Sequence, residues 1–414
     1  MVLAAFLVRL ALIVVLGTYH LNPARDHWRF GWEIGRVARS ITLGQGFSSP
    51  YQGQTGPTAH FVPVYPYLLA GVFKLFGLYS DASALAIMAL NSLFSALTCW
   101  SIFYLADKAF GRGVATVAAW LWVFHPLALY VSAKWVWETN LSALLLSLVF
   151  LAALHLRDAQ RLSAWTGFGL LCGVAALTNP ALVSVLPFTV AWCYRSRAKR
   201  SQALFLVAAS ALAFALCLAP WTLRNYHALG RFIPLRSNFW FEVYVGNNDK
   251  AIGKPVLDRH PSHNDDELAQ YRRLGENAYF AEKKREALAY ICTRPRRFAW
   301  LTLVRIATWW TGGWEIARRD WFGPWSTGLE FFGFTLQSCL GFLGLALAIR
   351  NRNPAAPLFA IFVFAYPLVY YFLFAGRRYS HPLDPVMVVL AVYALQQAFY
   401  RKQSEQVLAR PMAR

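Results

Sequence analysis

The chain of 414 residues has a formal net charge of +20; 57% of its residues are hydrophobic and only 14% are charged. Soluble domains carry about 25% charged residues, so several soluble domains of this composition could not cover their surfaces. Disordered and fibrous chains are excluded because they need low hydrophobicity or biased repeats. An all-α integral membrane protein remains. The basic residues form short clusters between apolar runs, which is typical of orienting charges and gives no sign of a nucleic-acid partner.

About ten apolar runs are long enough to cross a bilayer, since a helical crossing needs about 20 residues. The first run lacks the basic start and the cleavage site of a signal peptide, so we expect a retained helix. Arg9 within that run should face protein. The predicted spans cover residues 2–19, 83–106, 113–133, 139–156, 163–178, 180–194, 203–220, 329–349, 355–374 and 383–400.

The Lys and Arg clusters predict the orientation of these spans. With ten spans, the short basic loops all lie on one face, which the positive-inside rule identifies as the cytoplasm, together with both termini. Surface-lying helices are expected in the outer loops, one of them over 62–78. The chain then divides into an N-terminal transmembrane catalytic module, an extracytoplasmic region with an interfacial helix near 298–312, and C-terminal transmembrane helices with a short cytoplasmic tail. These regions cover 1–220, including the first outer loop at 20–80, then 221–328, and 329–414.

Two carboxylates in the first outer loop are candidates for a general base. Ile34, Val37 and Ile41 recur at helical spacing, and they predict a surface-lying helix that Glu33 opens and Asp26 precedes. A carboxylate at that point can accept a proton, but the helix dipole alone also favours an acid in the first turn. The sequence leaves both interpretations open.

Glu138 is a third acidic candidate, because it lies at the outer mouth of the fourth predicted span. A carboxylate at that depth is costly unless it is paired or hydrated. It either forms an i,i+4 ion pair with Lys134 or converges on the first outer loop as a second catalytic acid. Both interpretations stay open.

Outward-facing arginines break the positive-inside pattern and suggest an anionic ligand. Arg224 follows the seventh predicted span, and Arg377 and Arg378 lie together in the short loop between the ninth and tenth. Guanidinium groups bind phosphate bidentately and stay charged, so these side chains suit a lipid phosphate. The alternative is that they only snorkel at the membrane interface.

Metal and nucleotide sites have little support in the sequence. His60 is a weak candidate ligand, and His381 and Asp384 are too scattered to complete a set with it. Zinc, EF-hand and P-loop spacings and the dinucleotide-binding glycine motif are all absent. No cofactor is predicted firmly, although a divalent metal is not ruled out.

The chain resembles the polytopic membrane glycosyltransferases of the C-type fold that use polyprenyl-phosphate sugars, including the protein mannosyltransferases and aminoarabinose transferases of glycosyltransferase family 39. The resemblance rests on four stretches in matching order: GWEIGRVARSITLGQGF with PVYPYLLAGVFKLFG, WVWETNLSALLL, APWTLRNYHALGRFIPLRSNFWFEVYVGNN, and RRYSHPLDPVMVVLAVYAL. They are spread over nearly the whole chain, although each is degenerate. The resemblance implies the C-type architecture and an active site on the outer face of the membrane.

The resemblance also implies roles for single residues. The family usually has an Asp-Glu pair just ahead of the first outer helix; here that pair is absent and Glu33 follows about one turn later. The catalytic carboxylate therefore corresponds to Glu33, with Asp26 in reserve, and the second acid corresponds to Glu138. Phosphate contacts correspond to Arg224 and Arg378, and less firmly to Arg377 and Lys134.

The implied activity is an inverting transfer of a hexosyl or pentosyl group from a polyprenyl-phosphate donor to a lipid, glycan or protein acceptor. It would take place at the outer face of the cytoplasmic membrane, among membrane lipids. The rival prediction is a lipid-linked sugar flippase or another polytopic transporter. Transporters often show matching repeats and polar residues at mid-membrane, whereas the polar residues here gather at the outer ends of the spans.

Overall fold

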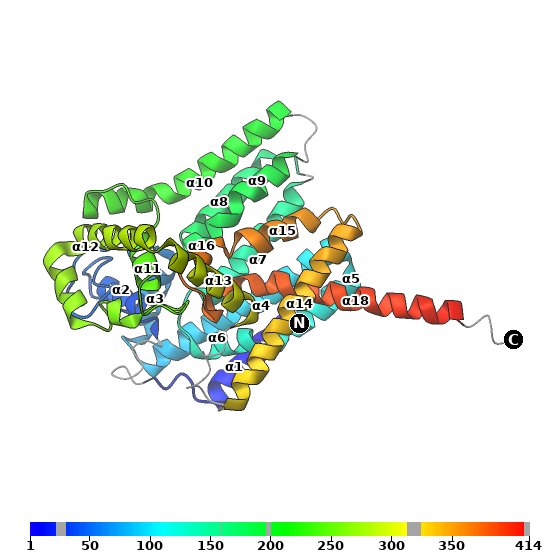
Figure 1. Ribbon diagram of the computed structural model, residues 1–414, viewed down its shortest axis with the longest axis horizontal. Coiled ribbons are helices and arrows are strands. Elements are labelled where there is room, and N and C mark those ends of the chain that lie inside the picture. The colour runs from blue at the N-terminus through cyan, green and yellow to red at the C-terminus, as the bar shows by residue number, and fades with distance from the viewer. Residues whose placement is uncertain (22–29, 158, 196–199, 313–323, 410–414) are drawn as a thin grey trace.

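The computed structural model describes residues 1–21, 30–157, 159–195, 200–312 and 324–409. Within these residues every regular element is a helix, and one isolated β-bridge joins Ser48 to Pro57. The expected all-helical fold is confirmed. Figure 1 shows α2 (Glu33–Thr42), α3 (Val64–Phe76), α11 (Phe239–Gly246) and α12 (Asp265–Thr293) gathered at one end of the molecule, opposite the end toward which α18 (Asp384–Ala409) extends.

Five helical segments of the described chain are long and apolar enough to cross a membrane, and a bent pair of helices adds a sixth candidate. The two helices of this pair meet at an angle of 42°. The five segments are α4 (Asp81–Phe110), α7 (Thr139–Leu156), α10 (Arg200–Leu229), the stretch Phe332–Arg350 of α14 (Pro324–Arg350), and Arg377–Phe399, which combines α17 (Arg377–Ser380), η4 (His381–Leu383) and the start of α18 (Asp384–Ala409). The bent pair is α5 (Arg112–Val123) with α6 (Pro126–Lys134).

Ten membrane crossings are therefore not confirmed. The remaining predicted spans form shorter helices, and a helix of about 15 residues is only about 22 Å long, less than the bilayer core. Pro367 interrupts one of them by separating two helices, and another begins at Pro180 with a 3₁₀ helix instead of an α-helix. These shorter elements are α1 (Val2–Val15), α8 (Leu162–Ala176), η2 (Pro180–Val185) with α9 (Leu186–Arg195), and α15 (Ala356–Ala365) with α16 (Leu368–Phe372).

Arg9 of α1 faces protein, as expected, and is fully buried. Its guanidinium donates to the Ser95 hydroxyl at 3.0 Å and to the carbonyl oxygens of Ala5, Trp122 and Val123. A buried cation needs such partners to offset its lost hydration. Arg9 thereby ties α1 to α4 and to the end of α5.

Three further predicted helices are present outside the long apolar helices. They are α2 (Glu33–Thr42), α3 (Val64–Phe76) and α13 (Pro295–Thr311). In α2 the buried side chains include Ile34 and Val37, at the helical spacing read from the sequence. In α13 the buried Arg305 donates to the Gly246 carbonyl at 2.6 Å and to the Asn247 amide oxygen at 3.0 Å.

A second layer of helices, not predicted from the sequence, covers the outer loop. It consists of α11 (Phe239–Gly246), η3 (Leu257–Arg259) and α12 (Asp265–Thr293). The Asn264 side chain caps α12 by accepting from the N–H groups of Asp266 and Glu267. Aromatic side chains, among them Phe241 and Tyr271, form a separate buried cluster between α11 and α12.

Glu276 of α12 fastens this layer to the first outer loop. Its buried carboxylate accepts from the Ala59 N–H at 2.8 Å, the Ser237 hydroxyl at 2.7 Å and the Tyr271 hydroxyl at 3.0 Å, and also from the Thr58 hydroxyl. Burial raises the pKa of Glu276, and these hydrogen bonds oppose that shift. The segment 57–60 is therefore held between α12 and the start of α11.

Candidate functional site

One cavity of about 620 Å³ lies where the first outer loop, the start of α7, the second layer and α17 meet. Its wall carries three carboxylates, Glu33, Glu138 and Glu242, and two guanidinium groups, Arg236 and Arg378. Ligand pockets typically combine a mostly apolar lining with a few placed polar groups. The structure thus brings Glu33, Glu138 and Arg378, all predicted from the sequence, to one cavity.

The turn at Gly31 and Trp32 joins the two acidic segments. Gly31 has φ 81°, and a Cβ at this position would lie 2.5 Å from the carbonyl oxygen of Val136. Only glycine allows so close an approach at that backbone angle. The chain then turns through Trp32, at φ 46°, into α2, so that Glu33 and Glu138 lie on the same cavity.

Glu33 is held by one hydrogen bond. The Ser262 hydroxyl donates to Glu33 Oε1 at 2.5 Å, and no donor to Oε2 is present among the residues that the structure describes. His260 Nδ1 lies 3.9 Å from Oε1, but it accepts the Ser262 N–H at 3.2 Å. The ring nitrogen therefore has no proton for Glu33, and we treat the contact as a close approach rather than an ion pair.

Glu138 caps α7 without a side-chain hydrogen bond, and its Oε2 is buried with no donor in the described part of the chain. The i,i+4 ion pair with Lys134, one of the two interpretations that the sequence left open, does not form, because α6 ends at Lys134 and residues 135–137 leave the helical path. Lys134 Nζ lies instead 5.4 Å from the Tyr130 ring centroid. Lys134 is absent from the cavity lining, whereas Glu138 belongs to it.

The two adjacent arginines face different surroundings. Arg378 lines the cavity, with its guanidinium carbon 3.9 Å from the Trp137 ring centroid and its Nη2 donating to the Tyr379 hydroxyl at 2.6 Å. Arg377 lies outside the cavity lining, 3.6 Å from the Phe334 ring centroid on α14. Stacking on aromatic rings orients a guanidinium and leaves its edge for an anion.

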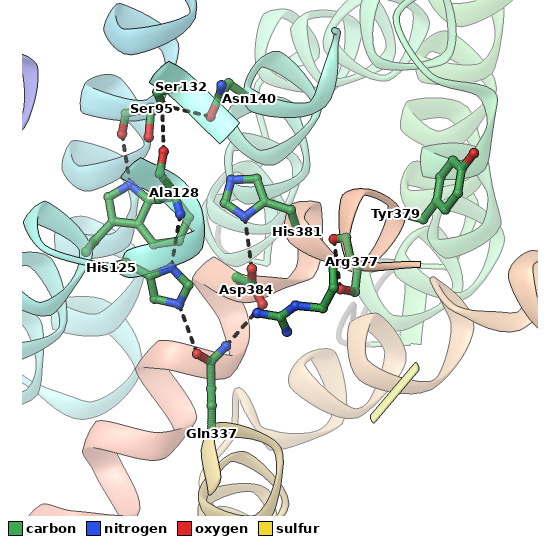
Figure 2. Close-up of polar contacts among 12 residues, drawn as sticks. Ser95, His125, Ala128, Ser132, Asn140, Gln337, Arg377, Tyr379, His381 and Asp384 are labelled. Atoms are coloured by element: carbon green, nitrogen blue, oxygen red, sulfur yellow. Dashed lines mark hydrogen bonds and ion pairs between the residues drawn. The ribbon is translucent and has the colours of Figure 1, made fainter. Parts of the chain in front are cut away.

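Arg377 lies next to a buried polar network. Figure 2 shows its guanidinium directed toward Gln337 and Asp384. Asp384 accepts from the Gln337 amide at 3.1 Å and contacts His381 Nδ1 at 2.9 Å, while His125 Nε2 lies 2.9 Å from the Gln337 amide oxygen. The network joins the start of α6, α14 and the start of α18.

Arg224 of α10 also lies outside the cavity lining. It donates to the carbonyl oxygens of Thr58 and Phe47, and its guanidinium carbon is 5.2 Å from the Phe47 and Trp221 ring centroids. Its visible contacts therefore hold the first outer loop against α10. Asp26 falls outside the described residues.

His60 lines the cavity but does not fit a metal ligand. Its Nε2 lies 3.3 Å from the Asn238 amide nitrogen and its Nδ1 lies 3.4 Å from the Tyr51 hydroxyl, so both ring nitrogens are engaged. Burial lowers the pKa of His60 well below its usual value. No group of three or more metal-binding side chains occurs among the described residues.

Several cavity residues escaped the sequence analysis. Glu242 accepts from the Arg236 guanidinium at 3.3 Å and from the Asn238 amide at 2.6 Å, and its burial raises the pKa of the carboxyl. His263 packs on Trp32 with ring centroids 4.6 Å apart. A single acid within the apolar stretch FWFEVYVG was the available signal for Glu242. His260 and His263 lie in a segment without a helical or strand pattern.

Comparison with known proteins supports the same class. Residues 57–222 match the family described as dolichyl-phosphate-mannose-protein mannosyltransferase. The archaeal oligosaccharyltransferase AglB from Archaeoglobus fulgidus, in complex with an inhibitory peptide and a dolichol-phosphate, has TM-score 0.58 at 14% identity, over 100% of this chain and 52% of that chain. ArnT from Cupriavidus metallidurans bound to undecaprenyl phosphate has TM-score 0.42 at 14% identity, over 96% of this chain and 77% of that chain. No curated protein sequence matches the chain.

The family match over residues 57–222 and the fold shared with AglB confirm the resemblance to polytopic glycosyltransferases of the C-type fold. At 14% identity the structural likeness to AglB shows the fold alone, and this chain spans about half the length of that protein. The family match ends at residue 222, so the second layer and α17 lie beyond it. The chain is a multi-pass membrane protein with a glycosyltransferase fold.

Proposed function

We propose that this protein transfers a sugar from a polyprenyl-phosphate donor to a lipid, glycan or protein acceptor at the outer face of the cytoplasmic membrane. The observation that carries the proposal is a single cavity lined by the carboxylates of Glu33 and Glu138 and the guanidinium of Arg378. A base and a phosphate-binding cation on one cavity suit a displacement in which phosphate leaves.

The reaction needs one base and one anion site. The acceptor oxygen or nitrogen attacks the anomeric carbon and forms the new glycosidic bond while its proton passes to Glu33. The bond between the anomeric carbon and the phosphate oxygen breaks, and its electron pair stays on the phosphate, where Arg378 stabilises the charge. A single displacement of this kind inverts the anomeric configuration. Asp26 is the reserve base, and Glu138 the second acid.

The anion site is built around Arg378, since Trp137 and Tyr379 hold its guanidinium. Arg377, Arg224 and Lys134 lie outside the cavity lining, so we give them supporting roles in holding α17, the first outer loop and the end of α6. Apolar residues where two apolar segments break, Ala181 of η2 and Leu373 after α16, line the same cavity and suit a lipid tail. The dolichol-phosphate in the AglB complex supports such a donor.

Turnover of defined polyprenyl-phosphate sugars by the purified protein in nanodiscs tests the proposal. Glu33→Gln should lower the rate at least 100-fold, since general base catalysis contributes about 10²–10⁴-fold. Asp26→Asn tests the reserve base. Glu286→Gln removes an acid that lies outside the cavity and should keep the wild-type rate.

Two outcomes would contradict the proposal. If Glu33→Gln and Asp26→Asn both keep full activity, neither is the base. If the protein moves a lipid-linked sugar across the bilayer without consuming it, the transporter prediction takes its place.

A further inference from the structure

Ser262 lies in a tight turn between η3 and α12, far from Glu33 in sequence. Its hydroxyl donates to Glu33 Oε1 at 2.5 Å across 229 positions. The turn is well fixed, because the N–H groups of His263 and Asn264 both donate to the His260 carbonyl and the Asn264 side chain caps α12. The hydroxyl is therefore presented to Glu33 from a rigid segment of the second layer.

His260 fixes Ser262 rather than Glu33. Its Nδ1 accepts the Ser262 N–H at 3.2 Å, which requires an unprotonated nitrogen at that position. Burial lowers the pKa of His260, which keeps the ring neutral near pH 7. Ser262 is thus the one hydrogen-bond donor to the Glu33 carboxylate among the residues that the structure describes.

We propose that Ser262 is a positioning residue for Glu33, holding Oε1 so that Oε2 faces the acceptor. This inference rests on the proposed function. A glutamate side chain loses substantial rotamer freedom when it is fixed, and a hydrogen bond from a rigid turn supplies that ordering in advance. The same bond stabilises the ionised carboxylate, which is the form that accepts a proton. The Ser262 proton stays on its own oxygen throughout the reaction.

The other titratable groups near Glu33 come from every surrounding element. Arg36 lies on its own helix, His260 and His263 on the turn, Tyr51 on the first outer loop, Glu242 on α11 and Arg378 on α17. Removing the Ser262 hydroxyl leaves all of these groups in place, so its contribution can be measured alone.

Steady-state kinetics of Ser262→Ala, Ser262→Cys and Ser262→Thr test the inference. Hydrogen bonds to charged groups are strong enough that Ser262→Ala should lower kcat roughly 10- to 100-fold. The donor KM should stay nearly unchanged, because the hydrogen bond holds the base and does not bind the donor. The near-isosteric Cys variant, a weak donor, should behave similarly, and Thr, which keeps the hydroxyl, should restore most of the rate.

Ser237→Ala is the matched control, because Ser237 also donates its hydroxyl to a buried carboxylate, Glu276, which lies outside the cavity lining. It should leave kcat and the donor KM unchanged. Wild-type kinetics in Ser262→Ala and Ser262→Cys alongside an inactive Glu33→Gln would overturn the positioning role and leave the proposed function standing. So would a loss of rate in both variants that Ser262→Thr does not restore. An active Glu33→Gln would instead remove Glu33 as the base.

Discussion

The contact between Gly31 and the Val136 carbonyl gives a sharp test of how the site is assembled. An alanine at position 31 would meet two penalties. An L-residue at φ 81° costs about 1–2 kcal/mol, and a Cβ placed 2.5 Å from Val136 oxygen forces an overpacked contact that costs about 1–3 kcal/mol more. We expect a total of about 2–5 kcal/mol, concentrated where Glu33 and Glu138 meet.

Gly44→Ala provides the matched control. Gly44 lies in the same outer loop at φ 76°, but a Cβ there meets nothing within 4 Å, so it carries the backbone penalty alone. Thermal unfolding in nanodiscs should give Gly31→Ala a lower melting temperature than Gly44→Ala. The turnover rate of Gly31→Ala should also fall roughly 100-fold below that of Gly44→Ala, because a displacement of about 1 Å between reacting groups costs that much in rate. Equal stability and equal turnover in the two variants would refute the reasoning.

Two further perturbations separate binding from structural roles. Arg378→Lys loses the planar stacked guanidinium and should raise the donor KM about tenfold. Arg224→Lys should lower the melting temperature and leave the donor KM unchanged. The reverse pattern would exchange the roles of the two arginines. Glu276→Ala leaves the Ala59 N–H without its acceptor and should cost about 2–4 kcal/mol, measured by denaturation. Glu276→Gln keeps one acceptor oxygen and should cost less. Burial raises the pKa of Glu276, so the folded protein holds the Glu276 proton to a higher pH than the unfolded chain does. The wild type should therefore lose stability relative to Glu276→Gln as the pH rises through the raised pKa of Glu276. A gain of stability over the same rise in pH would contradict this expectation.

The sequence predicted the helices whose signals are local. The apolar run 139–156 matches α7, and the spacing of Ile34 and Val37 correctly predicted the buried face of α2. The same local rule overestimated the number of crossings. Composition counts apolar residues without regard to direction. The break at Pro367 was therefore counted within one full span, and the short 3₁₀ helix that begins at Pro180 was counted as the start of another.

The candidate site also contains some residues that the sequence could predict and others that it could not. Glu33, Glu138 and Arg378 could be found because each interrupts a local pattern, an acid at a helix start or a cation on the wrong face. Which arginine reaches the cavity could not be found, since Arg377 and Arg378 are adjacent and only the packing against Trp137 and Phe334 separates them.

The role of Ser262 could not be predicted from the sequence. A serine in an irregular segment carries no pattern, and its effect depends on a contact with Glu33 that the fold of the second layer creates. The same holds for Gly31, whose need for glycine comes from a carbonyl more than a hundred positions away. Local chemistry selects which side chains are able to act, and tertiary contacts decide which of them are held in place to do so. Variants at these two contacts should therefore reduce turnover without replacing any reacting group.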